Sequence, residues 1–493
     1  MKENLIEQYY LLKNILKIEI SFFKYKIVEP LLNDDLKKEL DKLINYVVFE
    51  DFYLEGRNLF EDFEKAKSFV KEKIKNLSIL ELNVLAYYLL KELTYKDLLP
   101  LFIDPAIEDI TIKENSFIHI YHDKYGWLRT NIFLSKEEAE KLTAIYSEKA
   151  YTFVSLANPF GEGILPNKDR FAAIFRLEES GFTIRRFKKK KFSIIDIINY
   201  GTIDIKTAAY LWLIIENPVI CKLIINGPTG SGKTTFLNAI LNFIPINKRL
   251  VAIEERVSEL NIPLNNYFVI ITDSNNPRKS AFQALVNTLR QRPDYIVVGE
   301  IRGKETKIFF QALNTGHAGL TTFHSKNIYE MINRLTSQEL GIEEKVIHSL
   351  KTAIFIGYQG VSKRKVYSIY EITEDDYLEV AKYNSVKNKM EFFYEKTDIF
   401  KSLQEVTGLP ISTIKQDYLY KMLFLYYLKI NNIREKETVD KYFYKYYTEP
   451  YRFAKEIIID LIKKDIDIPD LKLKEIKKLE KYKNPYSSFK EIF

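Results

Sequence analysis

The sequence has 493 residues but only one cysteine, Cys221, and no long apolar run. A single cysteine excludes a disulfide framework within the chain. The densest apolar stretch, residues 210–215, is far shorter than the roughly 18 residues that a membrane span requires, so any membrane contact is expected to be peripheral. The first residues also lack the charged and then apolar pattern of a secretory signal. These absences predict a cytoplasmic protein.

The excess of charge is also small. A net charge of +7 arises from 74 basic and 67 acidic residues, which permits contact with nucleic acid or acidic lipid without requiring it. The length is more than one core usually organises, so two to four domains are expected. The hydrophobic fraction of 46% is enough to build large buried cores for them.

Residues 227–234 read GPTGSGKT and fit the phosphate-binding pattern G-x-x-x-x-G-K-[ST], the Walker A motif, without a mismatch. An apolar run precedes the motif and apolar residues at helical spacing follow it, which predicts a strand, a glycine-rich loop and a helix. Such a loop aims backbone N–H groups at phosphate oxygens. Lys233 is expected to reach the β and γ phosphates of ATP, and the Thr234 hydroxyl to bind Mg²⁺. The predicted nucleotide-binding residues are Gly227, Thr229, Gly230, Ser231, Gly232, Lys233, Thr234 and Thr235.

Two further strand-like runs end in carboxylates. Residues 250–253 run into Glu254 and Glu255, and residues 295–298 run into Gly299 and Glu300. The carboxyl edge of a parallel sheet is where such folds bind ligands, so Glu254 or Glu255 is predicted to orient the attacking water. Glu300 would hold Mg²⁺ directly or through water, as in a Walker B strand. An ordinary buried strand is the alternative for the second run, and the preceding Walker A motif favours the functional interpretation.

Histidines and arginines complete the candidate set. Residues 315–324 read TGHAGLTTFH, which places two histidines beside glycines at a strand edge, and His324 is predicted to sense the γ-phosphate; a structural histidine is the alternative. Arg185 and Arg186 open the most basic run, residues 185–191, just before the nucleotide domain. They could stabilise the transferring phosphoryl group of a neighbouring subunit, or belong to a solvated linker. His119 and His122 are interpreted as strand and turn residues, because no cysteine or further histidine accompanies them.

With these motifs the chain resembles the type II/type IV secretion ATPase superfamily, in its archaeal archaellum and type IV pilus branch. That family has an atypical Walker B motif close to LRxRPDxIxVGExR and a histidine box TGHxG…TxH; this chain has LRQRPDYIVVGEIR at residues 289–302 and the histidine box quoted above. Upstream, residues 157–159 and 182–187 are among the stretches similar to the archaeal N-terminal domain. The acidic "Asp box" departs from the family pattern: I-E-D-T-x-E-L is replaced by IEERVSEL at residues 253–260. The choice between Glu254 and Glu255 therefore stays open.

The resemblance covers residues 95 to 375 and implies a hexameric ATPase that uses ATP and Mg²⁺. It implies docking on a polytopic membrane platform protein and powering the assembly of pilin-like subunits at the archaeal membrane, with the protein peripherally associated with that membrane through its partners. A nucleic-acid-translocating ring ATPase is the alternative function, although nucleic acid is not the expected partner. A nucleotide-dependent scaffold without catalysis is a further alternative, against which the three glutamates argue.

The fold class predicted is α/β: a RecA-like P-loop ATPase domain with an N-terminal α/β domain and helical N- and C-terminal regions. The boundaries are residues 1–95 for the N-terminal helical region, 96–190 for the α/β domain and linker, 191–375 for the ATPase domain and 376–493 for the C-terminal helical domain. Within the last, the aromatic and lysine cluster at residues 442–447 could stack single-stranded bases. Core packing is the interpretation favoured there.

Overall fold

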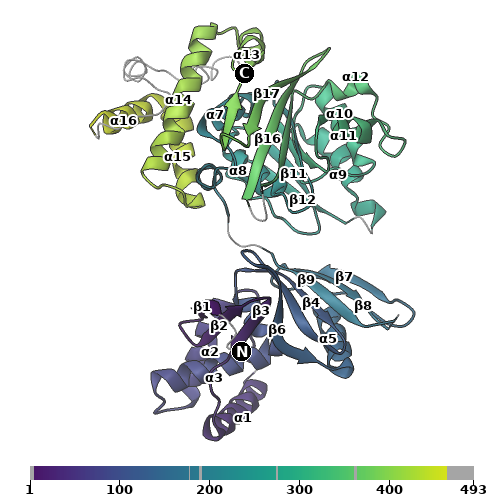
Figure 1. Ribbon diagram of the computed structural model, residues 1–493, viewed down its shortest axis with the longest axis vertical. Coiled ribbons are helices and arrows are strands. Elements are labelled where there is room, and N and C mark those ends of the chain that lie inside the picture. The colour runs from purple at the N-terminus through teal and green to yellow at the C-terminus, as the bar shows by residue number, and fades with distance from the viewer. Residues whose placement is uncertain are drawn as a thin grey trace. The chain divides into compact units, whose positions relative to one another are not determined.

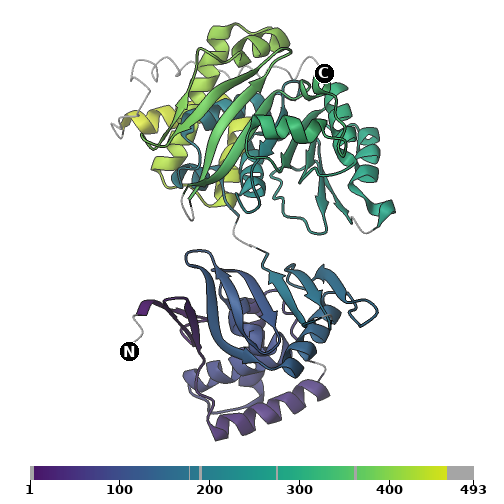
Figure 2. The ribbon, with the colours of Figure 1, turned by 45° about the vertical axis from the view of Figure 1, so that its right-hand side comes forward.

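The computed structural model describes residues 5–50, 52–176, 178–187, 191–273, 276–359 and 363–463, without the side chains of residues 451, 462 and 463. The chain divides into two compact units, Met1–Lys189 and Lys190–Phe493, here called the first and second units (Figures 1 and 2). In the described part of the chain, no helix combines the length and apolar character needed to cross a membrane. The four-domain division predicted from the sequence stays a prediction.

The first unit combines one mixed sheet with helices. Its elements are β1 (Leu5–Leu11), β2 (Leu16–Ser21), β3 (Lys24–Val28), α1 (Asp34–Phe49), α2 (Leu59–Lys73), α3 (Ile79–Leu93), η1 (Lys96–Leu98), α4 (Leu99–Ile103), β4 (Ile107–Lys113), β5 (Ser116–His122), β6 (Gly126–Leu134), α5 (Lys136–Lys149), β7 (Phe160–Ile164), β8 (Arg170–Ile174) and β9 (Gly181–Arg185). Nine described strands pair in the order β1-β2-β3-β6-β5-β4-β9-β8-β7. The strands and helices share one apolar core.

The sequence interpretation of residues 1–95 as mainly helical was wrong at its start. Strands β1, β2 and β3 form an antiparallel meander, and β3 pairs in parallel with β6. Leu16, Ile18 and Ile20 are buried while the residues between them are less so, which is the two-residue period of a strand. The helices expected further on are present as α1 and α3. Residues 1–4 lie outside the described part.

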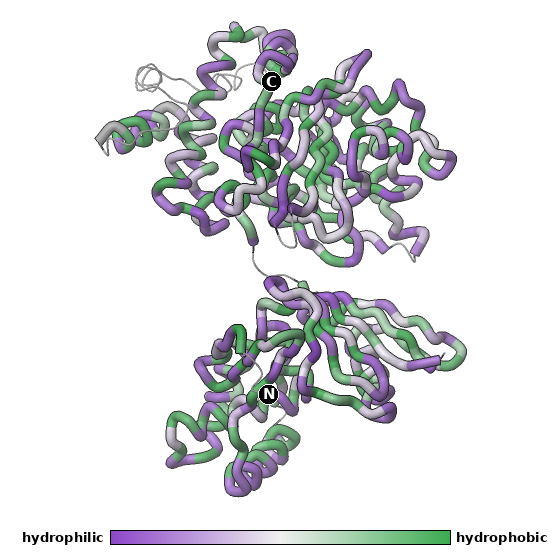
Figure 3. Tube along the Cα trace, in the orientation of Figure 1, coloured by the Kyte–Doolittle hydropathy of each residue, from purple (hydrophilic) through white to green (hydrophobic). Residues whose placement is uncertain are grey.

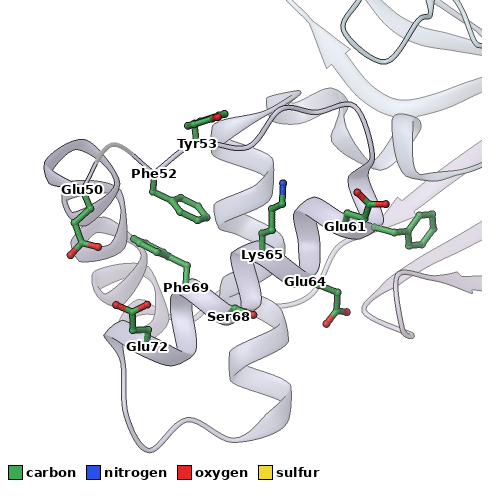
Figure 4. A pocket seen from close by; sticks show the side chains of 10 residues that line it. Glu50, Phe52, Tyr53, Glu61, Glu64, Lys65, Ser68, Phe69 and Glu72 are labelled. Carbon is green, nitrogen blue, oxygen red and sulfur yellow. The ribbon is translucent and has the colours of Figure 1, made fainter.

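A surface hollow of about 990 Å³ lies on the first unit, lined by residues of the α1 end, the following loop and α2 (Figure 4). The rings of Phe52 and Phe69 stack with their centroids 4.1 Å apart. Glutamates surround this aromatic floor: Glu50, Glu61, Glu64 and Glu72. Three of them are paired, Glu50 and Glu72 with Lys73 at 2.6 and 2.9 Å and Glu64 with Lys13, so the rim is largely neutralised.

The second unit is built on another sheet of nine described strands, in the order β12-β11-β13-β14-β10-β15-β16-β17-β18. The elements are α6 (Ile194–Asn199), α7 (Ile205–Glu216), β10 (Lys222–Asn226), α8 (Lys233–Ile240), η2 (Leu241–Phe243), β11 (Leu250–Glu255), β12 (Tyr267–Thr272), η3 (Pro277–Lys279), α9 (Ala281–Thr288), η4 (Leu289–Gln291), β13 (Tyr295–Val298), α10 (Glu305–Asn314), β14 (Ala318–Phe323), α11 (Ile328–Thr336), α12 (Glu344–Ile347), β15 (Thr352–Gln359), β16 (Lys363–Ile372), β17 (Tyr377–Asn384), β18 (Lys389–Phe392), α13 (Ile399–Thr407), α14 (Ile411–Ile430), α15 (Lys436–Thr448) and α16 (Pro450–Lys463).

The strands from β12 to β15 are parallel, and β16 to β18 continue the sheet in antiparallel fashion. One strand, β14, separates β10 from β13, and this order is that of RecA-like P-loop domains. Helices α9 to α12 lie on one side of the sheet and α7 and α14 on the other (Figure 1). The α/β fold class with a RecA-like domain is therefore confirmed.

Successive side chains of a strand point to opposite faces of the sheet, so one strand can contribute to both cores. In β13, Tyr295 and Val297 belong to the core beneath α7 and α14, whereas Ile296 and Val298 belong to the core beneath α9 and α10. The tube of α14 carries both hydrophobic and hydrophilic residues (Figure 3), and residues 420–425 are all buried, so the middle of this helix is covered on every side. The sheet is thus fixed on both faces, which holds the carboxyl ends of its strands in place.

The C-terminal prediction also needs a correction. Residues 376–493 were expected to be helical, but β17 and β18 extend the sheet before α13 begins. Helices α13 to α16 follow as expected, and residues 464–493 lie outside the described part. The aromatic cluster is mainly core: the Trp212 ring contacts Phe443, Tyr446 and Tyr447 at centroid distances of 4.8, 4.7 and 6.5 Å. The packing interpretation of this cluster is confirmed.

A charged group is buried where α7 meets α14. Lys421 is fully buried; its Nζ lies 2.7 Å from Oε2 of Glu216, contacts the Asp417 carboxylate, and donates to the Tyr446 hydroxyl at 3.1 Å. Burial raises the pKa of Glu216 to about 7, and the Lys421 charge opposes that shift. One cation therefore pairs with two buried carboxylates, so the stability of this contact between helices depends on the protonation of those carboxylates.

Candidate nucleotide site

The phosphate loop joins β10 to α8 and depends on its glycines. Gly230 and Gly232 have φ angles of +75° and +90°, in the left-handed region that side chains rarely adopt. A Cβ atom on Gly227 would lie 2.2 Å from the backbone oxygen of Ile356. The loop can keep this path only with glycine at these positions.

Helix α8 begins at Lys233, with Gly232 as its N-cap, so Thr234 and Thr235 lie in its first turn. The first N–H groups of a helix have no partner within the helix and carry a partial positive charge. They favour an anion at this end. The local structure is therefore the one that the Walker A motif predicts.

The Lys233 side chain curls over the loop. Its Nζ donates to the backbone oxygens of Gly227 at 2.9 Å and Pro228 at 3.0 Å, and lies 3.4 Å from Nδ1 of His324. Burial lowers the pKa of Lys233 to about 8, against the opposing effect of the Glu300 carboxylate. The ammonium group is thus held at the mouth of the loop.

His324 and Glu300 meet because their strands are neighbours. β13 pairs in parallel with β14, with Val298 opposite Thr321, so the residues that follow these strands emerge at the same edge. Nε2 of His324 contacts Oε1 of Glu300. Burial lowers the pKa of His324, the Glu300 charge opposes this, and nearby cations add to it. The structure thus brings together Lys233, His324 and Glu300, which lie far apart in the sequence.

Arg302 links the two groups of carboxylates. Its Nη2 lies 2.9 Å from Oε2 of Glu255 and its Nε lies 3.1 Å from Oε2 of Glu300. β11 lies next to β13, which brings Glu255 to this edge of the sheet. A chain of contacts therefore runs from the phosphate-loop lysine through histidine, glutamate and arginine to a second glutamate. Arg302 is the last residue of the Walker B motif in the sequence, and no role was predicted for it.

Glu254 and Glu255 have different surroundings. Oε2 of Glu254 accepts hydrogen bonds from the backbone N–H groups of Glu259 at 2.7 Å and Leu260 at 3.0 Å, and Oε1 accepts one from the Ser258 hydroxyl at 2.9 Å. Glu254 is buried, and burial raises its pKa. Its carboxylate therefore holds the following loop in shape, whereas Glu255 is half-buried and contacts Arg302.

Two residues on the β15–β16 hairpin also touch the phosphate loop, and no sequence motif includes them. Nε of Arg364 donates to the backbone oxygen of Gly230 at 3.2 Å, and the Tyr358 hydroxyl donates to that of Thr229 at 3.4 Å. Tyr358 and Arg364 are opposite each other in the hairpin. The hairpin therefore braces the tip of the loop.

The residues present fit Mg²⁺ bound together with a nucleotide. Among the described residues, no three histidine, cysteine or carboxylate side chains form a metal cluster. Mg²⁺ next to phosphates needs only one or two protein oxygens and keeps several waters. The Thr234 hydroxyl and the Glu300 carboxylate are hard oxygen donors of the kind it prefers.

Three other histidines make contacts of their own. His317 makes its described contacts at the end of α10, with Nδ1 3.2 Å from the Thr315 hydroxyl. His119 and His122 lie in β5, and His122 is buried with Nε2 3.5 Å from the Tyr9 hydroxyl. Both are therefore residues of a strand.

Arg185 and Arg186 lie at the end of β9 in the first unit. Arg186 is held there: its Nε lies 2.9 Å from Oδ2 of the buried Asp169, and its terminal nitrogens donate to the backbone oxygens of Leu101 and Phe102 at 2.7 and 2.8 Å. Arg185 is exposed. Residues 188–190 of the basic run lie outside the described part, and the role of both arginines in phosphoryl transfer stays a prediction.

The parallel sheet, the glycine-dependent loop and the carboxylates at the strand ends define a P-loop nucleotide-binding domain. Residues 170–362 match the family described as "Type II/IV secretion system protein". The chain belongs to this family, which confirms the resemblance predicted from the Walker B and histidine-box residues.

The chain is also similar to individual known proteins. The uncharacterized protein MJ0900 of Methanocaldococcus jannaschii is 36% identical over 330 residues, which cover 64% of this chain and 59% of that protein. MJ1287 of the same archaeon is 37% identical over 188 residues, which cover 37% of this chain and 68% of that protein. The X-ray structure of the Legionella pneumophila ATPase DotB is 17% identical with a TM-score of 0.42, covering 76% of this chain and 92% of that one. The chain thus spans less than two thirds of MJ0900.

Proposed function

We propose that this protein hydrolyses ATP to ADP and phosphate and that the second unit houses the reaction. The observation that carries the proposal is the continuous chain of contacts from Lys233 through His324, Glu300 and Arg302 to Glu255 at the mouth of the phosphate loop. A site for nucleotide binding alone needs the loop and its lysine. Carboxylates and an arginine beside them supply what turnover also needs, a group to orient water and a charge to position it.

The residues take distinct roles in this proposal. Backbone N–H groups of the loop and the first turn of α8 bind the phosphates, with Lys233 neutralising their charge. Thr234 and Glu300 hold Mg²⁺, which supplies charge stabilisation at the phosphates when bound. His324 contacts both Lys233 and Glu300, so it can sense a γ-phosphate that enters between these two side chains. Each role uses a residue that already lies at this edge of the sheet.

Glu255 is the better candidate for orienting water. Three hydrogen bonds from the loop engage the Glu254 carboxylate, whereas Glu255 makes its described contact with Arg302. A base that works on water must have an oxygen directed to the substrate. We therefore propose Glu255 for the water and Glu254 for the shape of the loop.

The family assignment supports a motor role, in which ATP turnover drives type II/IV secretion or the assembly of a type IV pilus-like or archaellum filament. We propose that the protein works as a hexamer, docked on a polytopic membrane platform protein and thereby peripheral to the archaeal membrane, with pilin-like subunits served indirectly. The archaeal relatives support the archaeal setting. No observation on the described residues favours the nucleic-acid-translocating alternative.

The test is phosphate release by the purified full chain. Lys233→Ala should abolish it, because removing the charge from the β and γ phosphates costs several kcal/mol, on the order of 3 or more, in the transition state. Lys345→Ala is the matched control, because Lys345 is an exposed lysine of the same unit paired with Glu343 at 2.8 Å. Near-normal turnover by a folded Lys233→Ala protein would refute the site assignment.

A further inference from the structure

A second pocket in the second unit, of about 770 Å³, is lined by lysines and aromatic rings. Its walls come from the α6–α7 connection, the β16–β18 strands and α14. The lysines that line it are Lys206, Lys363, Lys365, Lys389 and Lys429, whereas the lining carboxylate is Asp204. Asp204 accepts a hydrogen bond from the Thr207 N–H at 2.8 Å and so caps α7. The pocket therefore carries a strong excess of positive charge.

Lys365 is the least exposed of these lysines, with 8% of its surface accessible. Its Nζ donates to the backbone oxygen of Gly201 at 2.6 Å and lies 5.3 Å from the centre of the Tyr383 ring. Among the described residues, Lys363, Lys365, Lys389 and Lys429 form no ion pair with a carboxylate. Burial and the charge of Lys363 lower the pKa of Lys365. A buried cation without a counter-ion is costly unless an anion joins it.

The rest of the lining suits the apolar body of a small ligand. Phe392, Tyr394 and Tyr418 contribute rings, and Met422 contributes a flexible apolar side chain. Hydrogen bonds fix parts of the wall: the Tyr383 hydroxyl donates to Oδ1 of Asn388 at 2.5 Å, and that of Tyr418 donates to the backbone oxygen of Lys206 at 3.1 Å. Pockets of several hundred Å³ with apolar walls and a few convergent charges are typical of small-molecule sites.

Strand β16 connects this pocket with the phosphate loop. Lys363 and Lys365 line the pocket, and Arg364 between them donates to the backbone oxygen of Gly230 on the loop. Successive side chains of a strand point to opposite faces, so one short segment presents two lysines to the pocket and one arginine to the loop. A ligand that binds Lys363 and Lys365 would therefore affect the part of β16 whose Arg364 contacts the phosphate loop.

We propose that this pocket binds a phosphate-bearing small ligand with an apolar or aromatic body, at a site separate from the phosphate loop. The lysines neutralise the phosphate and the rings receive the body. Two sources share this chemistry, a free nucleotide and the headgroup of an anionic phospholipid. Binding there tightens or loosens the hold of Arg364 on the loop and so changes the apparent affinity for ATP.

Equilibrium dialysis of the full chain with ADP tests the nucleotide source. The wild type should bind about two ADP per chain, Lys233→Ala about one, and Lys365→Gln/Lys389→Gln about one. Adding the two lysine changes to Lys233→Ala should weaken the remaining binding by about tenfold or more in affinity, because the charge contacts with the phosphate are lost. The control carries Lys345→Gln/Lys401→Gln, two exposed lysines of the same unit that are paired with acidic side chains.

Sedimentation with vesicles tests the lipid source. Vesicles of phosphatidylglycerol in phosphatidylcholine should carry down wild type and the control variant, and not Lys365→Gln/Lys389→Gln, while vesicles of phosphatidylcholine alone should carry down none. Thermal melts establish that each variant is folded. Loss confined to the lysine variant in either the ADP or the vesicle experiment supports the proposal and identifies the source. One ADP per wild-type chain together with equal sedimentation of the two double variants would overturn it.

Discussion

Nη2 of Arg302 lies 2.9 Å from Oε2 of Glu255, so an arginine in the segment that follows β13 is joined to the residue that ends β11. The same guanidinium reaches Glu300 at 3.1 Å. Arginine is suited to hold two carboxylates at once, because its donors are fixed in a planar fork. The contact keeps like charges at the mouth of the phosphate loop from repelling one another.

Arg302→Gln should lower turnover strongly and leave nucleotide binding nearly unchanged. Without the guanidinium, Glu255 and Glu300 repel and lose their common orientation, at a cost of about 3 kcal/mol in the transition state, or roughly a hundredfold in kcat. Steady-state phosphate release and binding of a fluorescent nucleotide measure the two effects. Arg278→Gln, a change in the exposed η3 segment of the same unit, is the control. Equal losses in binding and turnover would show that Arg302 serves only the fold.

Glu255→Gln and Glu254→Gln should fail in different ways. Glu255→Gln keeps the shape of the side chain and should melt like wild type, but turn over at least tenfold more slowly, because it loses the base for water. Glu254→Gln points an amide toward backbone donors and should cost about 1–3 kcal/mol in the free energy of unfolding. Chemical denaturation and phosphate release on both variants separate the roles. A stable but inactive Glu254→Gln protein would reverse the assignment.

Arg186→Ala should destabilise the first unit, whereas Arg185→Ala should not. Removing Arg186 leaves the buried Asp169 carboxylate without its cation, at a cost of about 3–5 kcal/mol. The exposed Arg185 is expected to matter within about 0.5 kcal/mol for stability. Denaturation followed by fluorescence measures both. Equal stability of the two variants would contradict the anchoring role of Arg186.

Arg185 is then the arginine to test across subunits. Arg185→Ala and Glu255→Gln proteins should each be nearly inactive, and reassembling them together should restore activity. In a randomly mixed ring about a quarter of the interfaces join an intact arginine to an intact glutamate, so up to that fraction of wild-type phosphate release should return. Each variant reassembled alone is the control. No recovery in demonstrated mixed rings would place any action of Arg185 within its own subunit.

The Glu216 carboxylate predicts a loss of stability as the pH rises. Its pKa is raised to about 7 by burial, so between its ordinary pKa near 4.5 and 7 the folded protein binds a proton that the unfolded chain does not. Stability should fall across that window, by at most about 3 kcal/mol. Denaturation of wild type and Glu216→Gln at pH 5 and pH 7.5 measures it, and the variant should lose less. Identical pH profiles would refute the prediction.

Local signals predicted the phosphate loop and the two carboxylate strands, because a strand, a glycine-rich turn and a helix are each encoded by neighbouring residues. The contact between Arg302 and Glu255 was not predicted, since it depends on β11 lying next to β13. Parallel pairing of Ile253 with Val298 brings the two ends together, and the sequence alone did not state which strands are neighbours.

The N-terminal strands were missed although their signal was present. In β2, Leu16, Ile18 and Ile20 alternate with polar residues, but the strand has only six residues and its partners are short as well. The longer stretches with helical periodicity, now α1 and α3, led to a helical prediction for the whole region. The antiparallel end of the second sheet was missed for a related reason: β18 has four residues, and its pairing with β17 is what makes it a strand.

Among the described strands, β12 is an edge strand of the second sheet. Its sequence YFVIIT has neither a charged residue nor a proline. Tyr267, Phe268 and Ile271 are 49%, 54% and 43% exposed. Natural sheets usually blunt such an open edge with lysine, proline or a bulge, because it templates further strands. An isolated chain with this edge uncovered is prone to aggregate as its concentration rises. Phe268→Lys places a charge on this edge strand and should raise the solubility of the isolated chain.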